Sequence, residues 1–288
     1  MRVTKAVLPV AGLGTRFLPV TKSVPKEMLP IVDRPCLDYI VAEAVEAGLS
    51  ELIFVSARGK DSMIEYFQRS PELEANLEAT GKRELAREVR RLGELATVVT
   101  VRQQEQLGLG HAVLAAAPAT GDEPFAVFLG DDVIRGERPA IRQLLDVHEE
   151  RGGCVVALWP VPREETKRYG ICGGPWVNPK VMQVQVMVEK PDPADAPSCE
   201  SIVGRYVLPG GTMDILRTVK PGRGGEIQLT DALAVLASRG EAWGTRFEGE
   251  RFDTGTPLGL LRASLFFALQ REDTAAGARA ILEELRGQ

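Results

Sequence analysis

Short apolar segments alternate with amphipathic ones along the first half of the chain. The apolar segments have the length of strands and cover residues 5–11, 51–57, 97–103 and 124–130. This alternation predicts strands and helices in βαβα order. Because the segments are apolar at successive positions, we predict strands covered on both faces, as in a parallel sheet between two helical layers. Ligands of such a sheet are expected beyond the carboxyl ends of the strands.

The stretches between these strands have the periodicity of helices. We predict crossover helices over residues 35–48, 111–117 and 139–151, the first of which ends at Gly48. Residues 72–95 are rich in charges of both signs but keep leucine and valine at helical spacing. This pattern favours a helical excursion that lies on the sheet surface with a solvated face. A partner-binding arm is the alternative.

The second half of the chain mixes strand and helix patterns. Strands are predicted over residues 154–161, 180–190 and 201–208, and residues 180–190 alternate with a period close to two. A smaller, partly antiparallel lobe fits this pattern. Helices are predicted over residues 211–216, 227–239, 257–270 and 274–286, the last with Asp273 or Thr274 as its N-cap. The fold class is therefore α/β.

Charge and composition exclude several kinds of protein. The 288 residues carry a formal net charge of −5, which gives no basic surface for sequence-independent binding to nucleic acid. No apolar run is long enough for a membrane span or a secretory signal, so we expect a cytoplasmic protein without a membrane partner. The four cysteines form no CxxC pair and are expected to be reduced. With only two histidines, a histidine-centred triad or a multi-histidine metal site is not expected.

The most informative stretch is VAGLGTRFLPVTKSVPKEMLPI, residues 10–31. Gly12 and Gly14 follow an apolar strand and let backbone N–H groups approach an anion, while Arg16, Lys22 and Lys26 add three cations. This combination suits a nucleoside triphosphate. The stretch matches neither the GxGxxG fingerprint, which requires glycine where Phe17 stands, nor the P-loop, which requires glycine at Thr21. The alternative is a glycine turn with solvated lysines.

Carboxylates at strand ends are candidate metal ligands. Asp131 and Asp132 follow an apolar strand, and Mg²⁺ takes one or two such carboxylates together with phosphate oxygens. Successive strand residues point to opposite faces, so we expect only one of the pair to face the site, and Asp132 in place of Asp131 stays open. Asp253, in RFDTGTPLG, is a second candidate ligand. An Asp pair that opens a turn, and a turn or cap role for Asp253, are the alternatives.

Glu189 and Lys190 end the alternating segment, and Pro191 stops it. A carboxylate beside an ammonium group suits a sugar hydroxyl and a phosphate, respectively. The alternative is a surface ion pair.

Taken in order, the motifs resemble those of the bacterial UTP–glucose-1-phosphate uridylyltransferases, also called UDP-glucose pyrophosphorylases. The resemblance covers nearly the whole chain and rests on GLGTRFLPVTKSVPKEMLPI, VRQQEQLGLGHAV, FLGDDVI, YGICGG, MVEKP, SIVGRYVL, GGEIQLTDAL and FDTGTPLG. It implies a Rossmann-like nucleotidyltransferase fold, with a mixed, mostly parallel sheet flanked by helices and a smaller sugar-binding lobe. It also implies the reversible conversion of UTP and glucose 1-phosphate to UDP-glucose and pyrophosphate. One domain, residues 1–288, would comprise a nucleotide-binding half (1–150), a sugar-binding half (151–260) and C-terminal helices (261–288).

The resemblance also implies a role for individual residues. Arg16, Lys26 and Lys190 would be the catalytic cations, with Arg16 and Lys26 on the triphosphate and Lys190 on the sugar phosphate. The nucleotide would contact Ala11, Gly12, Gly14 and Asp131, with Gln103 and Gly108 at the uracil. Mg²⁺ would lie on Asp131 and Asp253, and glucose would lie against Gly170, Glu189 and Gly204. Many relatives have DCG where this chain has Asp253, Thr254 and Gly255, which affects the expected sugar selectivity but keeps the metal ligand.

Two other readings stay open at the level of sequence. One is a related enzyme for another nucleotide or sugar, such as a thymidylyltransferase, and the other is a non-catalytic paralogue that binds UDP-sugars. Relatives form dimers or tetramers, so a homo-oligomer is expected. Phe266, Phe267 and Leu269 suit either an interface or, as we expect, the core of the monomer.

Overall fold

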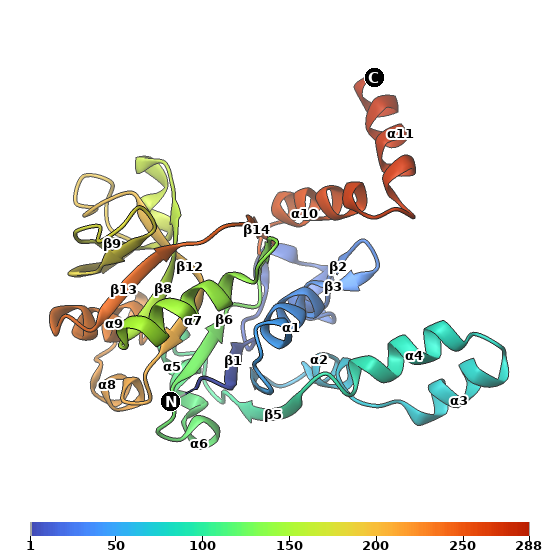
Figure 1. Ribbon diagram of the computed structural model, residues 1–288, viewed down its shortest axis with the longest axis horizontal. Coiled ribbons are helices and arrows are strands. Elements are labelled where there is room, and N and C mark those ends of the chain that lie inside the picture. The colour runs from blue at the N-terminus through green and yellow to red at the C-terminus, as the bar shows by residue number, and fades with distance from the viewer. Residues whose placement is uncertain (1, 288) are drawn as a thin grey trace.

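One central sheet organises the molecule (Figure 1). The structure is a computed structural model and describes residues 2–287. Across the sheet the strands follow the order β10 (Val181–Gln183), β13 (Ala242–Arg246), β8 (Cys154–Pro160), β12 (Glu200–Leu208), β6 (Phe125–Phe128), β1 (Lys5–Pro9), β4 (Glu51–Ser56) and β5 (Thr97–Arg102). The pairs β6–β1, β1–β4, β4–β5 and β13–β8 are parallel, whereas β12 is antiparallel to both of its neighbours. The sheet is therefore mixed, with a parallel first half, as the sequence predicts.

Burial of the strands follows their position in the sheet. The interior of β1, β4 and β6 is fully buried, because helices cover both faces there. The prediction of two covered faces is wrong for residues 97–103, since no residue of β5 is fully buried. β5 is the edge strand, and its threonines and Arg102 face solvent.

Two helical layers flank the sheet. One hydrophobic core cluster is covered by α1 (Cys36–Glu46), α2 (Asp61–Tyr66), α7 (Ala140–Arg151) and α10 (Pro257–Gln270). The other cluster is covered by α5 (Leu109–Ala115), α8 (Thr212–Thr218) and α9 (Leu229–Ser238), and the short α6 (Ala117–Thr120) follows α5. These positions confirm the predicted helices to within a few residues. Within residues 2–287, no helix combines the length and the apolar character needed to cross a membrane.

The second half of the chain extends the same sheet and adds a small projection. The predicted single strand over residues 180–190 is wrong, because β10 and β11 (Val186–Glu189) are separate strands that pair with β13 and β9 (Gly170–Gly173), respectively. The 3₁₀ helix η4 (Arg163–Arg168) leads into β9. Two ribbons complete the strands, β2 (Pro30–Ile31) with β3 (Arg34–Pro35), and β7 (Asp132–Arg135) with β14 (Glu250–Asp253).

Residues 72–95 do not lie on the sheet, which corrects the prediction. They form a helical hairpin of α3 (Pro71–Ala79) and α4 (Arg83–Leu92) that projects away from the sheet beyond β5 (Figure 1). The hairpin packs on itself around buried Glu74, which pairs with Arg69 and Arg90 at 2.6 and 2.9 Å. Leu73 and Leu85 stay about half exposed, so the leucine spacing marked a helix but not a buried face.

The C-terminal helices lie at one side of the molecule, and the second of them projects from it (Figure 1). The predicted burial in the core is confirmed for Phe267, while Phe266, which packs against the same core cluster, and Leu269 are partly exposed. Helix α11 (Ala275–Arg286) follows α10 and has no buried residue. Thr274 occupies its N-cap position, but the Thr274 hydroxyl donates to the Ala268 carbonyl instead of capping the helix.

A buried ion pair joins the sheet to the α1 and α7 layer. Arg205, in β12, is fully buried, and its Nη2 lies 2.6 Å from Glu43 Oε2 of α1. Glu43 Oε1 also accepts the Ile141 N–H at the start of α7, at 3.0 Å. The Arg205 Nη1 donates to the Gly204 carbonyl at 2.8 Å, and the guanidinium lies over the Phe128 ring. Each charge is therefore paired and hydrogen-bonded, as burial requires.

We expect Glu43→Gln to lower the free energy of unfolding by about 3 kcal/mol or more, because Arg205 is left as an uncompensated buried charge. Urea unfolding at neutral pH measures the change. Glu46→Gln is the control, since Glu46 is exposed on the same helix. Equal stability of the two variants would contradict the assigned role of the pair.

Candidate active site

The glycine-rich stretch folds as a loop at the carboxyl end of β1. It contains three 3₁₀ turns, η1 (Thr15–Phe17), η2 (Val20–Lys22) and η3 (Lys26–Met28). Gly14 has a φ of 66°, and a Cβ there would lie only 3.1 Å from the Cβ of Lys26. The Gly14 carbonyl accepts the Thr21 hydroxyl at 2.9 Å. The loop is thus closed on itself, with Lys26 beside the glycine turn.

Lys26 and Asp131 face each other across this end of the sheet. The Lys26 Nζ lies 2.6 Å from Asp131 Oδ2. Burial alone would lower the pKa of Lys26, but Asp131 and Glu27 outweigh it and raise that pKa. Burial would likewise raise the pKa of Asp131, and the Lys26 charge instead holds it below its usual value. Both groups are therefore charged at neutral pH, and with Gly14, Thr15, Arg16 and Gly255 they line one pocket.

A second lysine, Lys60, bonds to both ends of the loop. Lys60 is buried, and its Nζ donates to the Val10 carbonyl at 2.5 Å and to Glu27 Oε2 at 3.0 Å. Burial raises the pKa of Glu27 and lowers the pKa of Lys60, and the opposite charge of each offsets part of the shift. Lys60 thus ties the end of β1 to the residue that follows Lys26. No motif in the sequence marks it.

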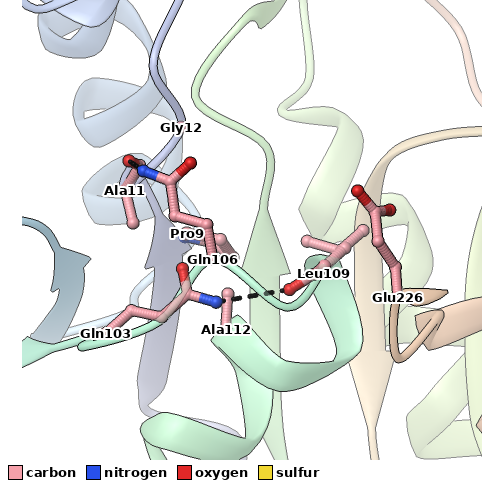
Figure 2. Close-up of a pocket in the computed structure, with 9 residues that line it drawn as sticks. Pro9, Ala11, Gly12, Gln103, Gln106, Leu109, Ala112 and Glu226 are labelled. Carbon is pink, nitrogen blue, oxygen red and sulfur yellow. Dashed lines mark hydrogen bonds between the residues drawn. The ribbon is translucent and has the colours of Figure 1, made fainter. Parts of the chain in front are cut away.

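A cleft of about 280 Å³ lies beside this loop (Figure 2). Four residues predicted to contact the nucleotide line it together: Ala11, Gly12, Gln103 and Gly108. The Gln103 Nε2 donates to the Gly108 carbonyl at 3.4 Å and lies 3.0 Å from His111 Nδ1. Gly108 has a φ of 98°, and a Cβ there would lie 2.8 Å from the Cβ of Glu226. Glycine is therefore required for Glu226 to approach the cleft.

Sequence reasoning did not identify Gln106 and Glu226, which also line this cleft. Figure 2 shows the Gln106 amide turned toward Ala11, whose carbonyl accepts its Nε2–H at 3.0 Å. This bond spans the cleft from the residues around Gln103 to the loop after β1. Gln106 lies within the VRQQEQLGLGHAV motif, but nothing in that motif singles it out.

The β7–β14 ribbon brings distant carboxylates together. Its register places Asp253 opposite Asp132 and hence next to Asp131. A Cβ at Gly255 would lie 2.7 Å from Asp131 Oδ2 and 3.1 Å from Asp253 Oδ1. The two carboxylates thus flank a space that only glycine leaves open. Among the residues described, no group of three or more His, Cys, Asp or Glu side chains is placed to hold a metal.

This donor set fits a hard cation that completes its shell with other oxygens. Mg²⁺ is usually held by one or two carboxylates together with waters and substrate phosphates. Asp131 and Asp253 supply two carboxylates at the open space, which is consistent with such an ion.

Asp132 is occupied by other contacts. It is buried, and its Oδ2 accepts the Gly204 N–H at 2.9 Å. Its Oδ1 lies 2.6 Å from Nη2 of Arg251, whose side chain is 9% exposed. Burial raises the pKa of Asp132, and the Arg251 charge offsets part of that rise. Asp132 also lines the hollow, but of the two aspartates it is Asp131 whose Oδ2 borders the space beside Gly255.

The projection formed by β9 and β11 supplies the other end of the hollow. Glu189 Oε2 accepts the Thr230 hydroxyl at 2.6 Å, and its Oε1 lies 3.2 Å from the Lys190 Nζ. Lys190 has a φ of 47°, which is uncommon for a residue with a side chain and ends the strand abruptly. A Cβ at Gly170 would lie 3.2 Å from Glu189, so glycine keeps this corner open.

Three of these pockets form one continuous hollow at the carboxyl edge of the sheet, and Leu109 lines both the last of them and the cleft of Gln103. Arg16 and Asp131 line both the loop pocket and the next pocket, which also contains Lys190 and Asp253. Lys190 in turn lines the pocket that holds Gly170 and Glu189. The lining residues that sequence reasoning missed include Arg168, Tyr169, Arg251 and Thr230. The first three lie within two residues of Gly170 or Asp253, which was the available signal, whereas Thr230 was marked only by the motif GGEIQLTDAL.

Two residues lie away from this lining. Lys22, one of the three cations of the loop, is exposed on η2. Gly204 is buried behind Asp132, and the position that its Cβ would take lies 2.4 Å from the Asp132 Cβ. A contact between Gly204 and a sugar stays a prediction.

Comparison with known proteins identifies relatives over nearly the full chain. Residues 5–270 match the model of the nucleotidyl transferase family. A UTP–glucose-1-phosphate uridylyltransferase of Bacillus subtilis is 47% identical over 272 residues, which are 94% of this chain and 93% of the relative. A UTP-bound UGPase from Acinetobacter baumannii superposes with a TM-score of 0.91 at 40% identity, covering 98% and 99% of the two chains. A UDP-glucose pyrophosphorylase complexed with UDP-glucose gives 0.86 at 39% identity, covering 93% and 100%.

We expect Gly204→Ala to lower the free energy of unfolding by about 1–3 kcal/mol, because the added methyl group overlaps the Asp132 side chain. Chemical denaturation followed by circular dichroism measures this. Gly12→Ala is the matched control, since nothing lies within 4 Å of a Cβ at that position, and its stability should change by less than about 0.5 kcal/mol. Equal stability of Gly204→Ala and Gly12→Ala would contradict the close packing of Gly204 against the Asp132 side chain.

Proposed function

This chain belongs to the nucleotidyl transferase family, and we propose that it transfers the uridylyl group of UTP to glucose 1-phosphate, giving UDP-glucose and pyrophosphate. The observation that carries this function is the continuous hollow. It runs from the cations and carboxylates around Asp131 to Glu189 and Lys190, and Leu109 lines both the Glu189 pocket and the neighbouring cleft of Gln103. A nucleotide bound at the loop after β1 and a sugar phosphate bound beside Glu189 would meet at the charged residues between them.

UTP is assigned to the end formed by the loop after β1. Uracil has an N–H donor between two carbonyl acceptors, and the Gln103 amide oxygen is an acceptor for that donor, while its Nε2 contacts the Gly108 carbonyl and His111 Nδ1. The triphosphate would lie along Gly14, Arg16 and Lys26, where the glycine exposes the backbone and the two cations offset negative charge.

Glucose 1-phosphate is assigned to the opposite end. Glu189 accepts hydrogen bonds and suits sugar hydroxyls, while Lys190 provides the cation for the phosphate. Gly170 leaves room for the ring beside Glu189.

Enzymes of this family generally use a divalent metal ion. We propose Mg²⁺, held by Asp131 and Asp253 at the space beside Gly255. When bound, the ion neutralises charge on the phosphate oxygens of the nucleotide.

The reaction needs positioning and charge neutralisation. A phosphate oxygen of glucose 1-phosphate forms a bond to the α-phosphorus of UTP, and the bond from that phosphorus to the bridging oxygen of the β-phosphate breaks. The attacking phosphate is already ionised at neutral pH, so no general base is required. Lys190 holds the attacking phosphate, and Arg16 and Lys26 stabilise the charge of the departing pyrophosphate. This mechanism agrees with the scarcity of histidine.

We also propose a homo-oligomer in a reducing compartment such as the cytoplasm. Leu258 and Leu261 of α10 are 80% and 54% exposed, and Ile281 and Leu285 of α11 are 57% and 59% exposed, which supports contact with another copy. The cysteines are free thiols, which supports the compartment.

The function is tested with a matrix of nucleotides and sugar phosphates, with and without Mg²⁺. Pyrophosphate release is expected with UTP and glucose 1-phosphate, to depend on the metal, and to fall when dTTP replaces UTP or another sugar phosphate replaces glucose 1-phosphate. Faster turnover with dTTP would reassign the nucleotide. A folded chain that binds UTP without any turnover would make it a non-catalytic paralogue.

Lys26→Ala and Asp131→Asn are each expected to lower kcat by about 10²- to 10³-fold, because each removes a preorganised charge from the reacting phosphates. Steady-state kinetics measures kcat, and circular dichroism checks that the variants fold. Lys22→Ala is the matched control, since Lys22 is an exposed lysine of the same loop. Turnover close to that of this control in either variant would count against the assigned role.

A further inference from the structure

Both carboxylates assigned to the metal are paired with a cation in the structure. Asp131 Oδ2 lies 2.6 Å from the Lys26 Nζ, and Asp253 Oδ2 lies 3.6 Å from the Arg168 Nη2. The first cation belongs to the triphosphate end of the hollow. The second was not identified from the sequence, and its place in the hollow has further consequences.

Arg168 lies where the two substrate ends of the hollow meet. It is the last residue of η4, just before Tyr169 and Gly170, and it lines both the pocket with Asp253 and the pocket with Glu189. Lys190 also lines both of these pockets. A phosphate held by Lys190 would therefore be within the same part of the hollow as the Arg168 guanidinium.

The contacts of Arg168 allow it to change partners. Its side chain is 48% exposed, and the 3.6 Å separation from Asp253 is too long for a hydrogen bond. On the other side, its Nη1 donates to Glu165 Oε2 at 3.3 Å. The guanidinium carbon lies 5.6 Å from the centre of the Tyr169 ring, which supports the side chain in this position. The Arg251 side chain, by contrast, is only 9% exposed and lies 2.6 Å from Asp132 Oδ1.

On the basis of the proposed function, we propose that Arg168 exchanges Asp253 for the phosphate of glucose 1-phosphate when a divalent metal ion binds at Asp253. Before binding, the guanidinium partly neutralises the carboxylate. A dication on Asp253 repels a neighbouring guanidinium and replaces it as the counter-ion. The released fork of N–H donors matches two oxygens of a phosphate, which an ammonium group cannot do.

This exchange predicts opposite effects on two ligands. Arg168 competes with the metal for Asp253, so its removal should strengthen metal binding. It also binds the sugar phosphate, so its removal should weaken that substrate. A residue that merely maintains the local fold would weaken both.

The test uses Arg168→Gln in the full chain. Without nucleotide, Mn²⁺ affinity is measured by electron paramagnetic resonance and is expected to rise about two- to five-fold, the range for loss of a partly exposed ion pair. At saturating UTP and Mg²⁺, the KM for glucose 1-phosphate is expected to rise about ten-fold or more, as for loss of a charged hydrogen bond. The KM for UTP should stay close to that of the parent chain.

Two further variants separate charge from geometry. Lys167→Gln removes the same charge one residue earlier, at an exposed side chain outside the pocket linings, and should move neither constant. Arg168→Lys keeps the charge without the fork, so Mn²⁺ affinity should stay near that of the parent chain while the KM for glucose 1-phosphate recovers only in part.

The proposed exchange is contradicted unless Arg168→Gln binds Mn²⁺ more tightly than the parent chain and also has a higher KM for glucose 1-phosphate. The Mn²⁺ measurement does not require turnover. An inactive parent chain would therefore contradict the proposed function. If the parent chain is active but Arg168→Gln does not show both expected changes, only the role of Arg168 is contradicted.

Discussion

Pairing of charge is the constraint on which the site depends. A hollow that receives two polyanions and a metal ion must hold cations and carboxylates close together, and a charge removed from water is stable only when it is paired. Five carboxylates at the hollow or just beneath it meet this constraint with a cation, in the pairs Glu27–Lys60, Asp131–Lys26, Asp132–Arg251, Glu189–Lys190 and Asp253–Arg168. The pairs offset the charges of the hollow and hold its side chains in place.

The pairs differ in how firmly they are held, and this difference separates structural roles from binding roles. Glu27, Lys60 and Asp132 are buried and the Arg251 side chain is only 9% exposed, so their partners are fixed by the fold. Asp131, Lys26, Asp253, Arg168 and Lys190 keep some exposure and border the open space. The buried pairs fix the backbone of the loop and of β7, while the more exposed pairs can give up a partner to a phosphate or a metal. Catalysis by positioning and neutralisation requires both kinds.

The rigid frame for these pairs comes from the sheet and the layer beneath it. β12 supplies Gly204, which holds Asp132, and Arg205, which is anchored to Glu43 of α1. Glu43 also receives the first turn of α7. The same strand therefore connects the candidate metal site to two helices of one layer. Because all of these groups are buried and hydrogen-bonded, the geometry at the edge of the sheet is set well before the substrates bind.

The sequence by itself determined the features that depend on local pattern. Apolar runs identified most strands, and glycines and cations identified the loop after β1. The parallel order implied that the Asp131–Asp132 pair would lie where ligands bind, at the carboxyl ends of the strands, whereas Gln103 was assigned only by the resemblance. The motifs also carried the resemblance to the family.

Tertiary structure alone decided which residues become partners across long separations. Examples are Asp253 beside Asp131 through the β7–β14 register, Lys60 bonded to Glu27, and Gln106 bonded to Ala11. It also decided that β5 is an edge, that residues 72–95 project, and that residues 180–190 divide between two neighbours. Periodicity records which side of an element is apolar, whereas register, exposure and ion-pair partners depend on what the rest of the chain places beside it.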